Sequence, residues 1–241
     1  MKFKIVSLFV LCAILISCGT SRQGGKKQRK GTKAQVVLTP EQQRKYDYFF
    51  LEASRLKMKD DYSAAFDLLQ HCLTINPNAS SALYEISQYY MYLKQVPQGQ
   101  AALEKAVEND PDNYWYSQGL ASLYQQQNEM QKATNLLENM ATRFSDRMDP
   151  LYSLLDIYNR LEEYANVITT LNRLEEKMGK NEQLSMEKFR IYLQKKDNQS
   201  AFREIESLVE EYPMDMRYQV ILGDVYMQND KKDEAYNIYK K

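Results

Sequence analysis

Apolar residues in the body of the chain recur at helical spacing, and short polar turns interrupt them at regular intervals. The first helix has a clear start signal, because Thr39 can cap it, Pro40 suits its first position and Gln42 completes a capping box. Only 8 glycines and 6 prolines occur in 241 residues, which favours continuous helix. The pattern predicts an all-α body that begins at residue 40.

The helical pattern repeats every 34 residues without insertion or deletion, and residues 80–113 show the unit most clearly. Units begin at residues 46, 80, 114, 148, 182 and 216, and the sixth is incomplete at residue 241. Positions 8 and 20 of the unit are mostly small, which lets two helices approach closely. Position 11 carries a large flat side chain between helices in five units: Tyr90, Tyr124, Tyr158, Tyr192 and Tyr226. Polar pairs at positions 15 and 16, such as Asp60-Asp61 and Asn128-Glu129, are expected to form the turn inside each unit.

This period, with an apolar residue at position 24 and proline or glycine at position 32, resembles the tetratricopeptide repeat family. The resemblance covers residues 46–241 and implies a tetratricopeptide-repeat superhelix, a helix-turn-helix solenoid of about six units. Unit 4 departs at Val167 and Gly179, and unit 5 at Lys188 and Phe189, but both keep the register. A coiled coil would instead repeat apolar residues about every 3.5 residues.

The first 17 residues resemble a signal peptide, with Lys2 and Lys4 followed by an apolar run over residues 5–16. That run is too short to cross a bilayer, which takes about 20 residues. It ends in LISC, residues 15–18, which resembles the bacterial lipobox. The resemblance implies that Cys18 is lipidated and anchors the chain to a membrane. Plain secretion and a short uncleaved anchor are the alternatives.

Residues 18–39 are predicted to be a lipidated cysteine followed by a basic flexible tether with a reach of roughly 25 Å. The tether is either a spacer or a contact for anionic headgroups, and it carries Arg22, Lys26, Lys27, Arg29, Lys30 and Lys33. No Asp or Glu occurs between Cys18 and Glu41, which favours the inner-facing leaflet. The expected location is the bacterial envelope, lipid-anchored, in the outer membrane and facing the periplasm.

The body is acidic although the whole chain is neutral. From residue 41 onward, 24 Lys and Arg oppose 32 Asp and Glu, a net charge of −8. Nucleic-acid binding needs clustered positive charge. We therefore expect no nucleic-acid partner.

The sequence contains no constellation for catalysis or metal binding. His71 and Cys72 are adjacent on a helix, so their side chains point about 100° apart. One histidine and one buried cysteine make neither a zinc site nor a nucleophile pair. We expect a protein that is not an enzyme, with no cofactor and no metal.

In the tetratricopeptide family the ligand lies in the concave groove, lined by the first helix of each unit. Carried over by position, this groove would hold a protein or peptide through Tyr84, Gln88, Met91, Tyr92, Trp115, Gln118, Gln125, Tyr152, Asn159 and Arg190. Trp115, the single tryptophan, is the best candidate for an energetic hot spot. The alternative is that these tyrosines and glutamines only form solvated helix faces. The family's carboxylate clamp is absent, because Phe50, Tyr84 and Gln118 stand at position 5.

The sequence therefore predicts a membrane-anchored scaffold for protein–protein contacts. Two alternatives stay open. One is an accessory subunit of an outer-membrane protein or pilus assembly machine. The other is the N-terminal part of a larger sensor or enzyme, since residue 241 falls inside the second helix of unit 6, which favours a longer array.

Overall fold

The computed structural model describes residues 37–240, which form twelve α-helices and no strand. The predicted signal peptide, Cys18 and tether residues 18–36 lie outside the described part. The helices are α1 (Pro40–Lys57), α2 (Tyr62–Ile75), α3 (Ser80–Tyr92), α4 (Val96–Asn109), α5 (Tyr114–Gln126), α6 (Met130–Arg143), α7 (Asp149–Arg160), α8 (Tyr164–Met178), α9 (Glu182–Gln194), α10 (Asn198–Glu211), α11 (Met216–Gln228) and α12 (Lys232–Tyr239). The all-α prediction is confirmed.

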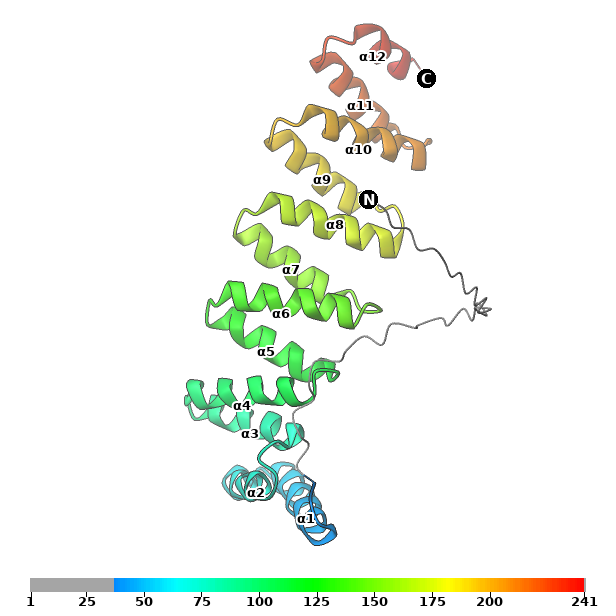
Figure 1. Ribbon diagram of the computed structural model, residues 1–241. Helices are drawn as coiled ribbons and strands as arrows, with labels where there is room; N and C mark the ends of the chain where they lie inside the picture. The colour runs from blue at the N-terminus through cyan, green and yellow to red at the C-terminus, as the bar shows by residue number, and fades with distance from the viewer. Residues whose placement is uncertain (1–36, 241) are drawn as a thin grey trace, which may run out of the picture. The chain divides into compact units, whose positions relative to one another are not determined.

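The helices form antiparallel pairs that follow one another along the array (Figure 1). Each helix packs mainly against the helices directly before and after it in the chain. The buried side chains fall into three clusters that follow the sequence: one around α1–α4, one from α4 to α9, and one from α9 to α12. This nearest-neighbour packing is the solenoid architecture that the repeat predicts.

Every pair of helices is joined by a turn with the same backbone conformation. Position 15 has a φ between 56° and 62° in all six units, at Asp60, Lys94, Asn128, Glu162, Lys196 and Asp230. The next residue donates its N–H to the carbonyl of position 11, for example from Glu129 to Tyr124 at 2.8 Å. This bond closes the end of the first helix and reverses the chain direction.

Small side chains let the two helices of a pair approach. Ala65, Ala133 and Ala201, at position 20, are fully buried. At the same position in unit 2, a Cβ added to Gly99 would lie 3.1 Å from the carbonyl oxygen of Ser87, at position 8. The expectation of close approach at positions 8 and 20 is therefore confirmed.

The position-11 tyrosines connect neighbouring units. The Tyr124 hydroxyl donates to Glu104 at 2.8 Å, and the Tyr158 hydroxyl donates to Glu138 at 3.3 Å. In both cases the acceptor belongs to the second helix of the preceding unit. Burial, together with Glu138, raises the pKa of Tyr158 to about 12, so this hydroxyl remains a donor.

Two helix ends follow the predicted local signals. Thr39 and Gln42 form the reciprocal capping box at the start of α1, with bonds of 3.2 and 2.9 Å. Helix α8 ends before Gly179, whose φ is 81°, a conformation that favours glycine. This explains why Gly179 takes the place of proline at position 32.

Unit 5 buries a lysine where other units bury an aliphatic residue. Lys188 is 2 % exposed at position 7, which is Leu120 in unit 3 and Leu154 in unit 4. Its ammonium lies 2.6 Å from Glu175 and 2.9 Å from Glu204. Burial tends to raise the pKa of Glu175, but hydrogen bonds from Lys188 and Lys180 outweigh it and leave the pKa lowered.

Replacing the left-handed residue Glu162 by glycine should stabilise the array. A residue with a Cβ is strained at this φ of 56°, and glycine removes the strain. We expect Glu162→Gly to raise the free energy of unfolding by about 0.5–1 kcal/mol. The control is Glu176→Gly, in the exposed last turn of α8, where φ is negative, which should lower it by up to about 1 kcal/mol. Urea denaturation measures both, and a loss of stability in Glu162→Gly would contradict the argument.

Replacing Lys188 alone should be costly, because Glu175 and Glu204 would keep only the less buried Lys180 as a cationic partner. We expect Lys188→Leu to lower the free energy of unfolding by about 3 kcal/mol. Neutralising both carboxylates as well, in Lys188→Leu/Glu175→Gln/Glu204→Gln, should restore part of that loss, since Lys180 then keeps only neutral partners. A triple variant no more stable than the single one would contradict this account.

The same cluster predicts a pH dependence. Because the folded pKa of Glu175 lies below its ordinary value of 4.5, its contribution is present above that pH. The contribution is lost as the pH falls through the folded pKa. Urea titrations between neutral pH and acid should therefore show a shallower acid loss in the triple variant than in the natural chain.

Candidate functional site

A hollow of about 370 Å³ lies on the first helices of the first three units. Helices α1, α3 and α5 supply its walls, together with the residue that caps α5. We name it the aromatic hollow, and it is lined by Phe50, Ser81, Tyr84, Glu85, Asn113, Trp115 and Tyr116.

Local contacts hold the walls of the aromatic hollow in place. The Tyr46 hydroxyl and the Ser81 hydroxyl are 2.9 Å apart, which connects α1 to α3. The rings of Tyr84 and Tyr116 lie 4.8 Å apart and connect α3 to α5. Asn113 caps α5 by accepting the backbone N–H of Trp115 at 3.1 Å, so the indole is presented by the first turn of that helix. Trp115 is 62 % exposed.

One carboxylate lies in the wall of the aromatic hollow. This is Glu85, which accepts a bond from Lys57 at 2.7 Å through Oε2. Burial raises the pKa of the Tyr116 hydroxyl, and the charges of Asp110 and Glu85 raise it further.

A second hollow, of about 300 Å³, lies at the other end of α1 and α3. We name it the tyrosine hollow, and it is lined by Lys57, Tyr62, Gln88, Tyr89 and Tyr92. The rings of Tyr62 and Tyr89 are 6.4 Å apart. Tyr92 is 82 % exposed, so its ring is available to a partner.

The structure gathers some of the predicted groove residues and separates others. Tyr84 and Trp115 share the aromatic hollow, whereas Gln88 and Tyr92 share the tyrosine hollow. Met91 instead packs against Gly99 inside its own helix pair. The missing side chain of Gly99 leaves space that the Met91 thioether occupies. The structure therefore places Met91 within the pair and not on the open face.

The remaining predicted residues lie outside both hollows. Gln118 accepts the Tyr114 hydroxyl at 3.0 Å on its own helix, and Gln125 is half-buried on α5. On α7, Tyr152 contacts the sulfur of Met178 at 3.4 Å and Asn159 is exposed. Arg190 forms an ion pair with Glu187 on α9. Side-chain contacts within units thus occupy part of the predicted surface.

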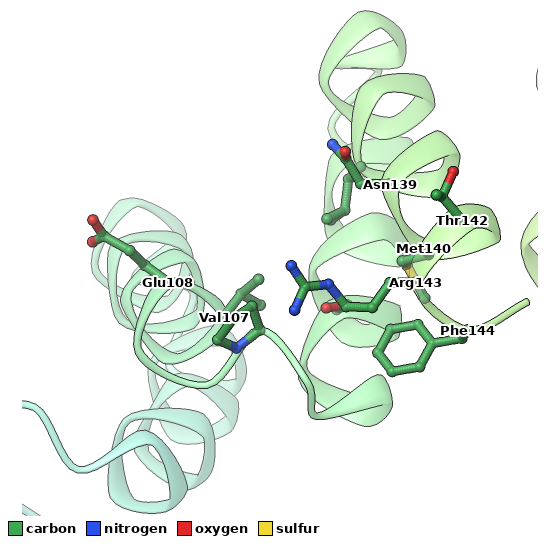
Figure 2. Close-up of a pocket in the computed structure, with 10 residues that line it drawn as sticks. Val107, Glu108, Asn139, Met140, Thr142, Arg143 and Phe144 are labelled. Carbon is green, nitrogen blue, oxygen red and sulfur yellow. The ribbon is translucent and has the colours of Figure 1, made fainter. Parts of the chain in front are cut away.

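A third hollow, which sequence reasoning missed, lies between the second helices α4 and α6 (Figure 2). It measures about 560 Å³ and is lined by both apolar and polar side chains: Val107, Glu108, Pro111, Ser117, Leu136, Asn139, Met140, Thr142, Arg143 and Phe144. Figure 2 shows Arg143 extending from α6 toward α4, and it pairs with Asp112. The sequence signal for this hollow would have been apolar residues at second-helix positions that the repeat places at the surface.

Cys72 and His71, the two residues considered for chemistry, lie in different environments. Cys72 is fully buried, and burial raises the pKa of its thiol to about 11. His71 is exposed and its ring lies 5.5 Å from Phe49. Across residues 37–240, no group of three or more His, Cys, Asp or Glu is placed to hold a metal ion.

None of the helices between residues 37 and 240 has the length and apolar character that crossing a bilayer requires.

Comparisons with known proteins agree with this architecture. The tetratricopeptide repeat model matches residues 80–113, and no curated protein matches the chain. A tetratricopeptide repeat protein from Parabacteroides merdae has 16% identity and a TM-score of 0.52, covering 82% of this chain and 78% of its own. A chain in the structure of Naa15/Naa10 bound to HypK-THB has 17% identity and a TM-score of 0.56, with 83% of this chain but only 31% of its own covered.

A further structure, the MamA RS-1 ArsTM double mutant, has 15% identity and a TM-score of 0.50 over 71% of this chain and 97% of its own. At these identities the similarity shows the fold. The matched unit, the six identical turns and the paired helices agree in register. The chain has the tetratricopeptide-repeat fold, and its residues 80–113 match the family's repeat.

Proposed function

We propose that this protein is a scaffold that binds a protein or peptide partner on the face formed by its first helices. The observation that carries the proposal is the aromatic hollow, where three consecutive units present Phe50, Tyr84 and Trp115 around one open space. Tetratricopeptide-repeat proteins are generally non-catalytic scaffolds, and a binding function fits the aromatic and amide side chains found here.

The physical basis is contact area that the fold leaves uncovered. Trp115 is 62 % exposed and Tyr92 is 82 % exposed, although large aromatic side chains are usually well buried. Aromatic residues are enriched at protein interfaces and at their hot spots. The two hollows lie along the same two helices, α1 and α3, so an extended peptide could contact both.

A structural neighbour offers a parallel for such a role. The neighbour with the highest of the three TM-scores comes from a complex of Naa15, Naa10 and HypK-THB, and so belongs to a protein assembly. That similarity concerns the fold and does not identify the partner of this chain. It supports the proposal only in that this helical array occurs where proteins assemble.

We further propose that the scaffold is anchored by lipid at Cys18 to the bacterial outer membrane, with the array facing the periplasm. Support comes from the order of features along the sequence: a basic start, an apolar run of 12 residues, the LISC segment and a basic linker. More than one acyl chain at the cysteine would give stable anchoring, whereas one chain is marginal.

Removing the indole should weaken partner binding. We expect Trp115→Ala to reduce affinity for the recovered partner by about 2 kcal/mol, the scale of an interface hot spot. The partner is isolated by crosslinking and pull-down from membranes, and affinity is then measured by calorimetry. The matched control is Tyr236→Ala, because Tyr236 is 63 % exposed on α12, far along the array. Equal affinities for Trp115→Ala and the natural chain would remove the basis for this site.

Removing the lipidation cysteine should release the protein. We expect Cys18→Ala to move the chain from the membrane fraction to the soluble fraction, because the apolar run alone is too short to span a bilayer. Fractionation followed by immunoblotting measures the change, with Cys72→Ala as the control. Retention of Cys18→Ala in the membrane would mean that another feature anchors the chain.

A further inference from the structure

We propose that the aromatic hollow binds a lysine or arginine side chain from a basic segment of the partner protein. This inference rests on the proposed function, because it gives the chemistry of the same site. It commits to a cationic guest, whereas the scaffold proposal holds for any protein or peptide.

The first reason is the composition of the walls. Four of the seven lining residues are aromatic, namely Phe50, Tyr84, Trp115 and Tyr116, and none is basic. The face of an aromatic ring carries negative charge density and attracts a cation placed within about 6 Å. Several rings around one hollow form the type of cage that recognises ammonium groups. A volume of about 370 Å³ leaves room for a long cationic side chain.

The second reason is the carboxylate in the wall. Glu85 is the single charged residue of the lining set, and Lys57 occupies its Oε2 at 2.7 Å. A carboxylate has two oxygens and can accept a second cationic donor. An apolar guest would instead desolvate Glu85 without offering it a hydrogen bond, which is costly. An acidic guest would be repelled.

The third reason is that aromatic rings at the start of α5 already contact the positively charged side chain of an arginine. The Arg147 guanidinium lies 4.0 Å from the Tyr114 ring centre and 5.6 Å from the Trp115 ring centre. The Tyr114 and Trp115 rings are therefore already in cation–π contact with an arginine of the chain itself. Residues 41–241 carry a net charge of −8, from 24 basic and 32 acidic residues, which attracts a basic partner over longer distances.

The single tryptophan of the sequence is a direct probe of the hollow. The full-length protein is titrated with a short peptide of alternating lysine and serine while tryptophan fluorescence is followed. Two matched peptides replace each lysine by norleucine, which keeps the stem without the charge, or by glutamate. We expect a saturable change with the lysine peptide, which weakens at high salt, and at least fivefold weaker binding of the other two. Equal binding of the norleucine peptide would overturn the cationic assignment.

Variants separate the hollow from general attraction to an acidic surface. The affinity of a dye-labelled lysine peptide is measured by anisotropy for Trp115→Leu, Glu85→Gln and Glu187→Gln. Trp115→Leu removes the π-face but keeps apolar bulk, and should weaken binding about fivefold. Glu85→Gln should weaken binding about threefold. Glu187 is the matched control, because it too forms an ion pair, with Arg190, but it lies on α9 and away from the hollow. Glu187→Gln should therefore leave the affinity unchanged. Equal losses in the two glutamine variants would overturn the proposal.

The chain's own basic residues are tested as a competing occupant. In the full chain Arg22, Lys26, Lys27, Arg29, Lys30 and Lys33 are replaced by glutamine. We expect the affinity of the lysine peptide to stay the same, whereas a marked increase would show that the chain's own segment fills the hollow and would overturn the assignment to a partner. If no peptide changes the fluorescence but Trp115→Ala still weakens binding of the recovered partner, the cationic inference fails and the scaffold proposal stands.

Discussion

Each pair of helices depends on one residue held in the left-handed conformation at position 15. In the six units this residue is Asp, Lys, Asn or Glu, its φ lies between 56° and 62°, and it is never glycine. Each accepts the strain because the turn brings position 20 against position 8, as Gly99 approaches Ser87. The packing of the pair outweighs the local cost, and all higher organisation follows from these pairs.

Contacts between units use a different kind of interaction. Tyrosine hydroxyls at position 11 reach carboxylates of the preceding unit, as Tyr124 reaches Glu104. Lys188 is an exception, because a charge replaces an aliphatic side chain and is held by Glu175, Glu204 and Asn172. A buried charge restricts the geometry around it, since a displacement would weaken the bonds that offset its desolvation. The joint between units 4 and 5 is therefore held by electrostatics as well as by apolar packing.

The proposed function depends on the aromatic side chains that this packing leaves exposed. The first three units use Tyr46 and Tyr116 to connect their first helices, and the same arrangement leaves Trp115 open beside them. A rigid aromatic surface costs a partner little ordering entropy on the side of the array. In the proposed role, the Glu85 carboxylate beside these rings would favour a positively charged guest. The proposed binding surface would thus arise from residues whose first role is packing.

The sequence by itself determined the period, the helical pairs, the small positions 8 and 20 and the polar turns, because these depend on local backbone preferences and nearest-neighbour packing. It also indicated Trp115 and Tyr84, which the structure brings together. Only the tertiary structure decided that Glu85 and Tyr116 join them, that Met91 packs against Gly99, and that a third hollow opens between α4 and α6. These contacts depend on side-chain direction and on the rotation between units, and a 34-residue period contains neither.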